Sequence, residues 1–137
     1  MIRSLRDKTD MEGDAMMQGW FVVSPEQGAK LIRLTMGGFF ASATIQQLRA
    51  ELVRAIASLS CPPNTHVTLC DIRQMDIQSQ ERVEEFSRLV GSEDIRSRKL
   101  AFVTAKSLAR LQAKRLTSRE GVAFFSDIDA ALEWLTG

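Results

Sequence analysis

From residue 42 onwards, helical and strand patterns alternate regularly along the chain. The first helical pattern is a set of apolar residues at steps of three and four: Ile45, Leu48, Leu52, Ile56 and Leu59. An apolar strand pattern follows at 67–72, and the alternation repeats with helices at 80–90, 106–116 and 128–135 and strands at 100–104 and 122–125. Strands joined through helices pair in parallel by right-handed crossovers. The sequence therefore predicts a sheet of mostly parallel strands with about four helices against it.

An antiparallel hairpin is predicted before this alternation. Residues 20–23 are aromatic and β-branched, 24–28 form a turn cluster, and 31–36 have the pattern of a second strand. Gly37 and Gly38 then break the strand in a turn that needs a positive φ angle. The expected fold is α/β with a single mixed sheet, antiparallel at its start and parallel beyond. It occupies 19–137, and residues 1–18, with seven charges and little apolar periodicity, are interpreted as a flexible N-terminal tail.

The composition removes several classes of function. Although 45% of the residues are hydrophobic, no run approaches the roughly 18 apolar residues of a membrane span. Without a secretory signal, Cys61 and Cys70 are expected to be reduced thiols in a cytoplasmic protein. One histidine and no tyrosine leave few metal ligands, and structural zinc needs about four nitrogen or sulfur ligands. No phosphate-binding glycine motif occurs, so we expect neither a metal nor a cofactor.

His66 is the one imidazole available as a catalytic base. A hydrolase would need it within hydrogen-bond reach of a nucleophile such as Cys61 or Ser79. Two prolines separate it from Cys61, and nothing in the sequence would lower the pKa of that thiol. We therefore expect His66 to be a strand-edge residue and the chain to have no catalytic residues.

Polar residues follow the buried strand 67–72. Asp71, Arg73 and Asp76 are expected at its carboxyl end, where ligands gather in open α/β sheets. Ser79 is the expected N-cap of the next helix, whose free N–H groups suit an anion. Two interpretations remain open. Either these residues form a surface for a ligand or partner, or Asp71 and Arg73 bond each other and Ser79 is only a cap.

The net charge of +1 hides a strong segregation of charge along the chain. Residues 95–119 hold eight basic residues and no acidic one, whereas 120–137 hold four acids and no base. Lys106, Arg110 and Lys114 stand four apart, so they would line one stripe of a helix and repel each other. An anionic partner explains this stripe, and so does neutralisation by acidic helices of the same chain. Nucleic acid is not expected, because the chain is nearly neutral and no aromatic side chains are interleaved with these bases for stacking.

The element order and local patterns resemble those of the SpoIIAA-like proteins, a branch related to STAS domains. The segments that carry the resemblance are 31–40 (LIRLTMGGFF), 70–81 (CDIRQMDIQSQE), 99–116 (KLAFVTAKSLARLQAKRL) and 122–135 (VAFFSDIDAALEWL). The resemblance implies a non-catalytic regulatory module that docks a protein, or a small anionic or lipid ligand. Asp71, Arg73, Asp76 and Ser79 would form the docking surface, with cationic contacts from Lys106, Arg110 and Lys114.

In the related antagonists of anti-sigma factors, a serine at a helix start after the third strand is phosphorylated. The resemblance therefore makes Ser79 a candidate phosphorylation site. The alternative function is that of related Sec14-like folds, namely a carrier of lipid or another small molecule, which would require an apolar cavity between sheet and helices. A homodimer through the edge strand 20–23 is also possible.

Overall fold

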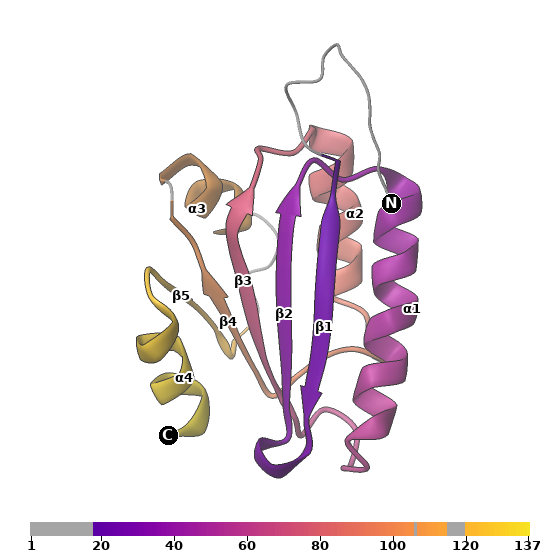
Figure 1. Cartoon of the computed structure of the whole chain (residues 1–137), viewed down its shortest axis with the longest axis vertical. Helices are drawn as coiled ribbons and strands as arrows, with labels where there is room; N and C mark the ends of the chain where they lie inside the picture. The colour runs from indigo at the N-terminus through magenta and orange to yellow at the C-terminus, as the bar shows by residue number, and fades with distance from the viewer. Residues whose placement is uncertain (1–17, 106, 115–119) are drawn as a thin grey trace.

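The computed structural model describes residues 18–105, 107–114 and 120–137, and of residues 107–110 it describes the backbone alone. Residues 1–17 of the expected tail lie outside the described residues. The elements are β1 (Trp20–Glu26), a 3₁₀ turn (Gln27–Ala29), β2 (Leu31–Gly38), α1 (Ser42–Ser58), β3 (Val67–Met75), α2 (Gln80–Val90), β4 (Lys99–Val103), α3 (Ser107–Lys114), β5 (Val122–Phe125) and α4 (Ile128–Thr136). The strands form one sheet in the order β1-β2-β3-β4-β5 (Figure 1). β1 is antiparallel to β2, and the other pairs are parallel. The predicted fold class is confirmed.

Each face of the sheet has its own apolar core. On one face, side chains of β2, β3 and β4 pack with those of α1, α2 and Ala113 of α3. On the other face, the buried set consists of Leu31, Val67, Leu69, Ala101, Val103, Ala131 and Leu135, the last two from α4. The alternation of side chains along each strand separates the two cores. The parallel strands are therefore apolar on both faces, as the sequence predicted for 67–72.

β1 is longer than predicted, and the turn comes later. Residues 24–26, expected in the turn, continue β1 as far as Glu26, and the chain reverses at Gln27–Ala29. Lys30 closes the turn with φ 49°. Pro25 lacks a backbone N–H, but β1 is an edge strand that bonds only β2, so proline is accommodated there.

The two glycines that end β2 have different roles. Gly38 has φ 78°, which confirms the predicted left-handed conformation at this position. Gly37 is an extended strand residue paired with Trp20. A Cβ atom at Gly37 would lie 2.4 Å from the Trp20 indole, so this glycine lets the indole lie directly against β2.

Two further expectations need correction. The sequence favours Ser42 or Thr44 as the N-cap of α1, because both can accept a backbone N–H bond, but the N-cap is Ala41, which makes no side-chain cap bond. Ser42 lies inside the helix, where its hydroxyl donates to Glu85 of α2 at 2.5 Å. β3 continues to Met75, so Asp71 and Arg73 lie within the strand and not at its end.

Candidate functional site

The loop between β3 and α2 is held by the side chain of Gln78, which is 7% exposed. Its Oε1 accepts from the Phe40 N–H at 2.9 Å, and its Nε2 donates to the carbonyls of Gly38 at 3.1 Å and Asp76 at 2.6 Å. The main chain of Gln78 is held in turn by Gln112 of α3. A buried amide with all these partners fixes the loop relative to β2 and α3.

Ser79 follows this fixed residue and starts α2. Its hydroxyl accepts from the Arg82 N–H at 3.3 Å, which confirms the predicted N-cap. The Ser79 side chain is exposed, and the first turn of α2 also contains the acidic Glu81. The structure thus places a hydroxyl at the positive end of a helix dipole and open to solvent.

Asp71 and Arg73 do not lie in the same site as Ser79. They continue the set of β3 side chains that begins with Val67 and Leu69, on the face of the sheet that α4 partly covers. Both carboxylate oxygens of Asp71 are engaged by Arg73, at 2.9 Å to Nε and 2.8 Å to a terminal nitrogen. Partial burial would raise the pKa of Asp71, but the hydrogen bonds and charge of Arg73 outweigh it and lower that pKa. Of the two interpretations, the structure shows the mutual ion pair.

Asp76 lies near Ser79 in the loop. It is half-buried, and its N–H donates to the Gly38 carbonyl at 3.1 Å. Its carbonyl oxygen accepts the bond from Gln78 described above. The contacts found for Asp76 are thus main-chain contacts that shape the loop.

The basic stripe is only partly within the described residues. Lys106 and the side chain of Arg110 lie outside them. Lys114 ends α3 and is exposed, with its Nζ 5.9 Å from the centre of the Phe124 ring. This cation–π contact places one cation of the stripe beside β5.

Sequence reasoning missed an apolar pair beside Ser79. Ile77 is 45% exposed and Leu111 is 57% exposed, and they immediately precede the mutually bonded residues Gln78 and Gln112. Their exposure depends on tertiary contacts that hold the loop and α3 together. In the sequence, Ile77 fell in the loop between a predicted strand and a predicted helix, and Leu111 was one of the apolar positions of the predicted helix 106–116.

Two cavities between the sheet and helices α1–α3 are small, whereas a hollow of about 330 Å³ lies at the amino ends of β3 and β4, beside Leu135 and Thr136 of α4. A pocket at the carboxyl ends of β2 and β3, lined by Met75, Phe86 and Ala113 among others, holds about 40 Å³. A second, beneath α1 and lined by Leu52, Cys70 and Ile95 among others, holds about 60 Å³. Pockets that enclose small molecules usually hold about 300–1,000 Å³. In this conformation neither pocket has room for a lipid chain, so neither supports the carrier hypothesis.

In the described part of the chain, the candidate catalytic base has no nucleophile within hydrogen-bond distance. His66 lies immediately before β3, at the edge of the strand as expected, and is 1% exposed. Neither ring nitrogen has a hydrogen-bond partner among the described residues. Burial lowers its pKa. Cys70 is buried too, and burial together with the charge of Asp71 raises the pKa of its thiol far above the usual range. Over the described ranges, no group of three or more histidine, cysteine or carboxylate side chains is placed to hold a metal ion.

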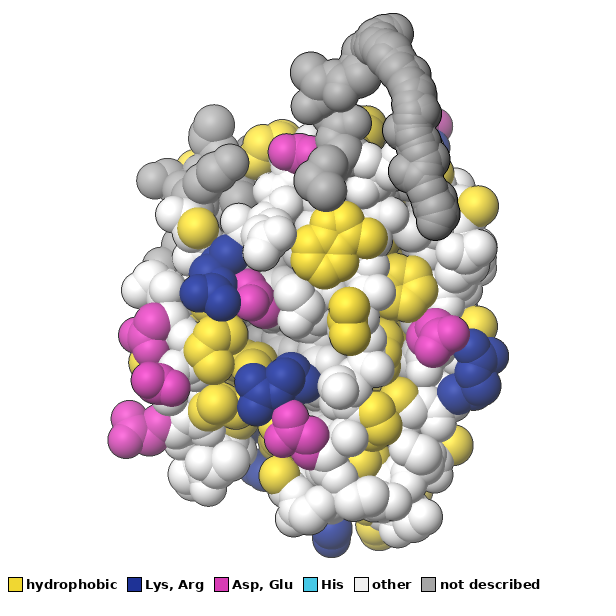
Figure 2. Space-filling model, in the orientation of Figure 1, with side chains coloured by type: hydrophobic (Ala, Val, Ile, Leu, Met, Phe, Trp, Pro, Cys, Tyr) yellow, Lys and Arg dark blue, Asp and Glu magenta, His cyan; other side chains and the backbone are white. Residues whose placement is uncertain are grey.

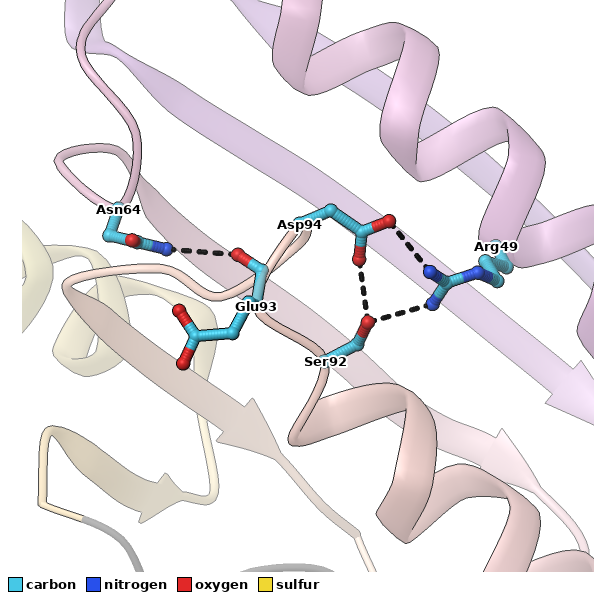
Figure 3. Close-up of polar contacts among 5 residues, drawn as sticks. All are labelled: Arg49, Asn64, Ser92, Glu93 and Asp94. Atoms are coloured by element: carbon cyan, nitrogen blue, oxygen red, sulfur yellow. Dashed lines mark hydrogen bonds and ion pairs between the residues drawn. The ribbon is translucent and has the colours of Figure 1, made fainter.

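A polar network fixes the loop between α2 and β4. Arg49 of α1 donates to Ser92 at 2.9 Å and to Asp94 at 2.6 Å, and the Ser92 hydroxyl donates to Asp94 at 2.6 Å (Figure 3). The amide of Asn64 donates to the carbonyls of Glu93 and Arg96, and its backbone has φ 64°. These polar groups form hydrogen bonds with one another. The network therefore has a structural role: it connects α1 and the loops at the amino ends of β3 and β4.

Comparisons with known proteins agree on the fold. No family model matches the chain, and no curated protein matches it. A protein of the DUF3478 family with a SpoIIAA-like fold, from Shewanella loihica, superimposes with a TM-score of 0.63 at 21% identity, over 91% of this chain and 98% of that one. An anti-sigma factor antagonist from Mycobacterium paratuberculosis gives a TM-score of 0.56 at 12% identity, over 85% of this chain and 93% of that one. No helix in the described part of the chain has the length and apolar character needed to cross a membrane. The chain therefore has the SpoIIAA-like fold that its sequence patterns predicted.

Proposed function

We propose that this chain is a regulatory module without catalytic activity, which docks a protein partner. The docking surface consists of the loop 76–79, the start of α2 and the adjoining α3. This proposal keeps Ser79 and Asp76 from the predicted site. Asp71 and Arg73 are left out because they lie on the face of the sheet that α4 partly covers and not in the loop with Ser79.

The observation that carries the proposal is the exposed apolar pair next to Ser79. The described residues contain four exposed large hydrophobic side chains, and two of them, Ile77 and Leu111, flank the bonded pair of Gln78 and Gln112. Apolar side chains held on a rigid backbone lose little entropy on binding and are typical centres of protein interfaces. A fixed apolar pair beside a polar helix start fits a protein surface better than a free anion.

Ser79 would regulate this docking. A phosphate on its hydroxyl adds a charge of about −2 at the start of α2, beside Ile77. The helix dipole would stabilise the phosphate itself, while a partner that buries Ile77 would have to desolvate it. The fold shared with an anti-sigma factor antagonist supports a protein partner. Lys106, Arg110 and Lys114 would provide cationic contacts to acidic side chains of the partner.

Affinity purification with matched variants tests the proposal. Wild-type chain, Ile77→Asp and Val53→Asp are expressed in the native host, and the proteins that they retain are compared. Val53 is a suitable control because it is 37% exposed on α1, away from the loop. We expect wild type and Val53→Asp to retain the same partner and Ile77→Asp to lose it. Equal retention by Ile77→Asp would overturn the docking surface.

The regulatory step is tested separately. Intact-mass analysis of the purified chain shows whether it carries phosphate, and Ser79→Ala should abolish that mass. Ser79→Glu is then compared with wild type for binding of the captured partner. A chain without phosphate, together with unchanged binding by Ser79→Glu, would refute regulation at Ser79 and leave the docking surface standing.

A further inference from the structure

One face of the sheet is only half covered. α4 contacts β3, β4 and β5, and its buried residues Ala131 and Leu135 complete the core on that side. Beyond Leu31, which begins β2 and packs in the core with Ala131 and Leu135, no described helix lies over β1 and β2 on this face, whereas α1 contacts β1 from the other face (Figure 1). On this face, α4 therefore covers β3, β4 and β5, and most of β1 and β2 beside it is bare, that is, not covered by a described helix.

The bare strands present an apolar centre. Trp20, Val22 and Thr35 lie on this face, as their pairing across β1 and β2 requires. Val22 is 57% exposed, and the Trp20 indole lies close against Gly37. Figure 2 shows hydrophobic side chains over β1 and β2 with two groups of paired charges beside them. A flat apolar surface that includes a tryptophan is typical of the centre of a protein interface.

Two ion pairs lie on this face, and in one of them the arginine is much more exposed than its acidic partner. Arg73 exposes 43% of its side chain, but its partner Asp71 exposes only 15%. Arg33 and Glu26 form the second pair, with similar exposure of 36% and 41%. An approaching surface thus meets the Arg73 guanidinium before the Asp71 carboxylate. An acidic surface would be complementary there.

The outer face of α4 is such a surface. Asp129 and Glu133 are four residues apart, both are exposed, and neither forms an ion pair with any described residue. They lie opposite Ala131 and Leu135, which face the sheet. Like charges at this spacing repel each other and destabilise a helix, so an arginine of another molecule placed between them would reduce this repulsion within α4.

We propose that two copies of this chain dock face to face, with α4 of each copy lying on the bare β1 and β2 of the other. A two-fold axis makes each copy supply both a bare surface and an acidic helix. Strand spacing and rise give β1 and β2 a footprint of about 230 Å². This is well below the roughly 800 Å² that each partner buries in a stable interface, so reciprocal contact, which adds the outer face of α4, is required.

This interface is independent of the proposed function. The docking loop and α2 belong to the carboxyl ends of the strands and to the face covered by α1 and α2. A dimer built through α4 and β1–β2 leaves Ser79 exposed in both copies. The dimer would therefore present two docking surfaces, and failure of either proposal would leave the other intact.

Sedimentation analysis over a range of concentrations tests the dimer. We expect wild type to dimerise reversibly and Val22→Glu to raise the dissociation constant at least about tenfold, or ~1.4 kcal/mol. Asp129→Lys/Glu133→Lys should do the same, whereas Val53→Glu on α1 should leave the constant unchanged. Circular dichroism checks that each variant is folded. A wild-type chain that stays monomeric, or equal weakening by Val53→Glu, would overturn the proposal.

Photocrosslinking identifies what occupies the bare surface. The photoreactive residue benzoylphenylalanine is placed at position 22, and the crosslinked peptides are identified by mass spectrometry. We expect links between copies, from position 22 to residues 127–137. Links within one chain to residues 1–17 would show that the chain covers its own surface and would refute the dimer. Links between copies confined to 20–26 would show edge-to-edge pairing of β1 and would refute it too.

Discussion

Gln112 bonds both main-chain polar groups of Gln78. Its Oε1 accepts from the Gln78 N–H at 2.8 Å, and its Nε2 donates to the Gln78 carbonyl at 2.8 Å. This is the hydrogen-bond pattern that a neighbouring strand would supply, here provided by one side chain of α3. It joins α3 to the loop that carries Ser79, although the two lie 34 residues apart in sequence.

Gln112→Ala removes both of these bonds. We expect the free energy of unfolding to fall by about 1–3 kcal/mol, because the main chain of a mostly buried residue loses its partners. Urea unfolding measures the change, and Gln47→Ala, at an exposed position of α1, is the matched control. If both variants were equally stable, the bonds between Gln112 and Gln78 would not hold the loop.

Gly37→Ala should disturb the contact between β1 and β2. The added Cβ would lie 2.4 Å from the Trp20 indole, so the ring must leave β2. We expect a loss of about 1–3 kcal/mol, the usual cost of overpacking, and a change in tryptophan fluorescence. Gly28→Ala is the control, since a Cβ there meets no atom within 4 Å. Unchanged fluorescence and stability in Gly37→Ala would contradict this account of Gly37.

The order of elements could be predicted because each segment has a clear period. The strand 122–125 was predicted at the residues where it occurs, and the predicted helix 128–135 is found as α4 with one further residue. Errors came where tertiary contacts override local preference. Pro25 signals a turn in the sequence, yet it lies in an edge strand whose free side needs no N–H donor.

The candidate site was predicted less completely, for a related reason. Ser79 was found because an N-cap is a local feature. Asp71 and Arg73 were misplaced because β3 extends beyond its apolar run, and strand length depends on pairing with β2. The roles of Gln78 and Gln112 could not be predicted, because long-range contacts decide which polar side chain becomes buried.

Ser79→Ala removes the side-chain cap of α2. We expect a loss of about 1 kcal/mol, independent of any signalling role, because the Arg82 N–H loses its acceptor. Ser79→Asp should restore most of it, since aspartate also caps and favours the helix dipole. Asp127→Ala at the start of α4, where the carboxylate accepts from Ala130 at 2.9 Å, provides a comparison. Thermal unfolding at neutral pH measures all three, and a neutral Ser79→Ala would show that the cap contributes nothing.

His66 makes stability depend on pH in a defined direction. Burial lowers its pKa in the folded chain, whereas the unfolded chain titrates with the ordinary value of about 6.5. Below that pH the unfolded state binds a proton that the folded state does not bind. The free energy of unfolding should therefore be constant above about pH 7.5 and fall as the pH drops below about 6.5, by up to ~1.4 kcal/mol per unit, until the folded pKa is reached.

His66→Leu separates this effect from the titration of carboxylates. Leucine has no ionisable group, so the decrease between about pH 7 and pH 5 should disappear in the variant. The carboxylates with lowered pKa, such as Asp71 beside Arg73, act in the same direction, because there too the unfolded state binds the proton first. Their stabilisation is lost at lower pH, as the pH falls below about 4 towards their folded pKa. Urea unfolding of both proteins from pH 8 to pH 4 distinguishes the two. If His66→Leu lost stability over the pH 7 to 5 range as steeply as wild type, another group would be responsible for that decrease.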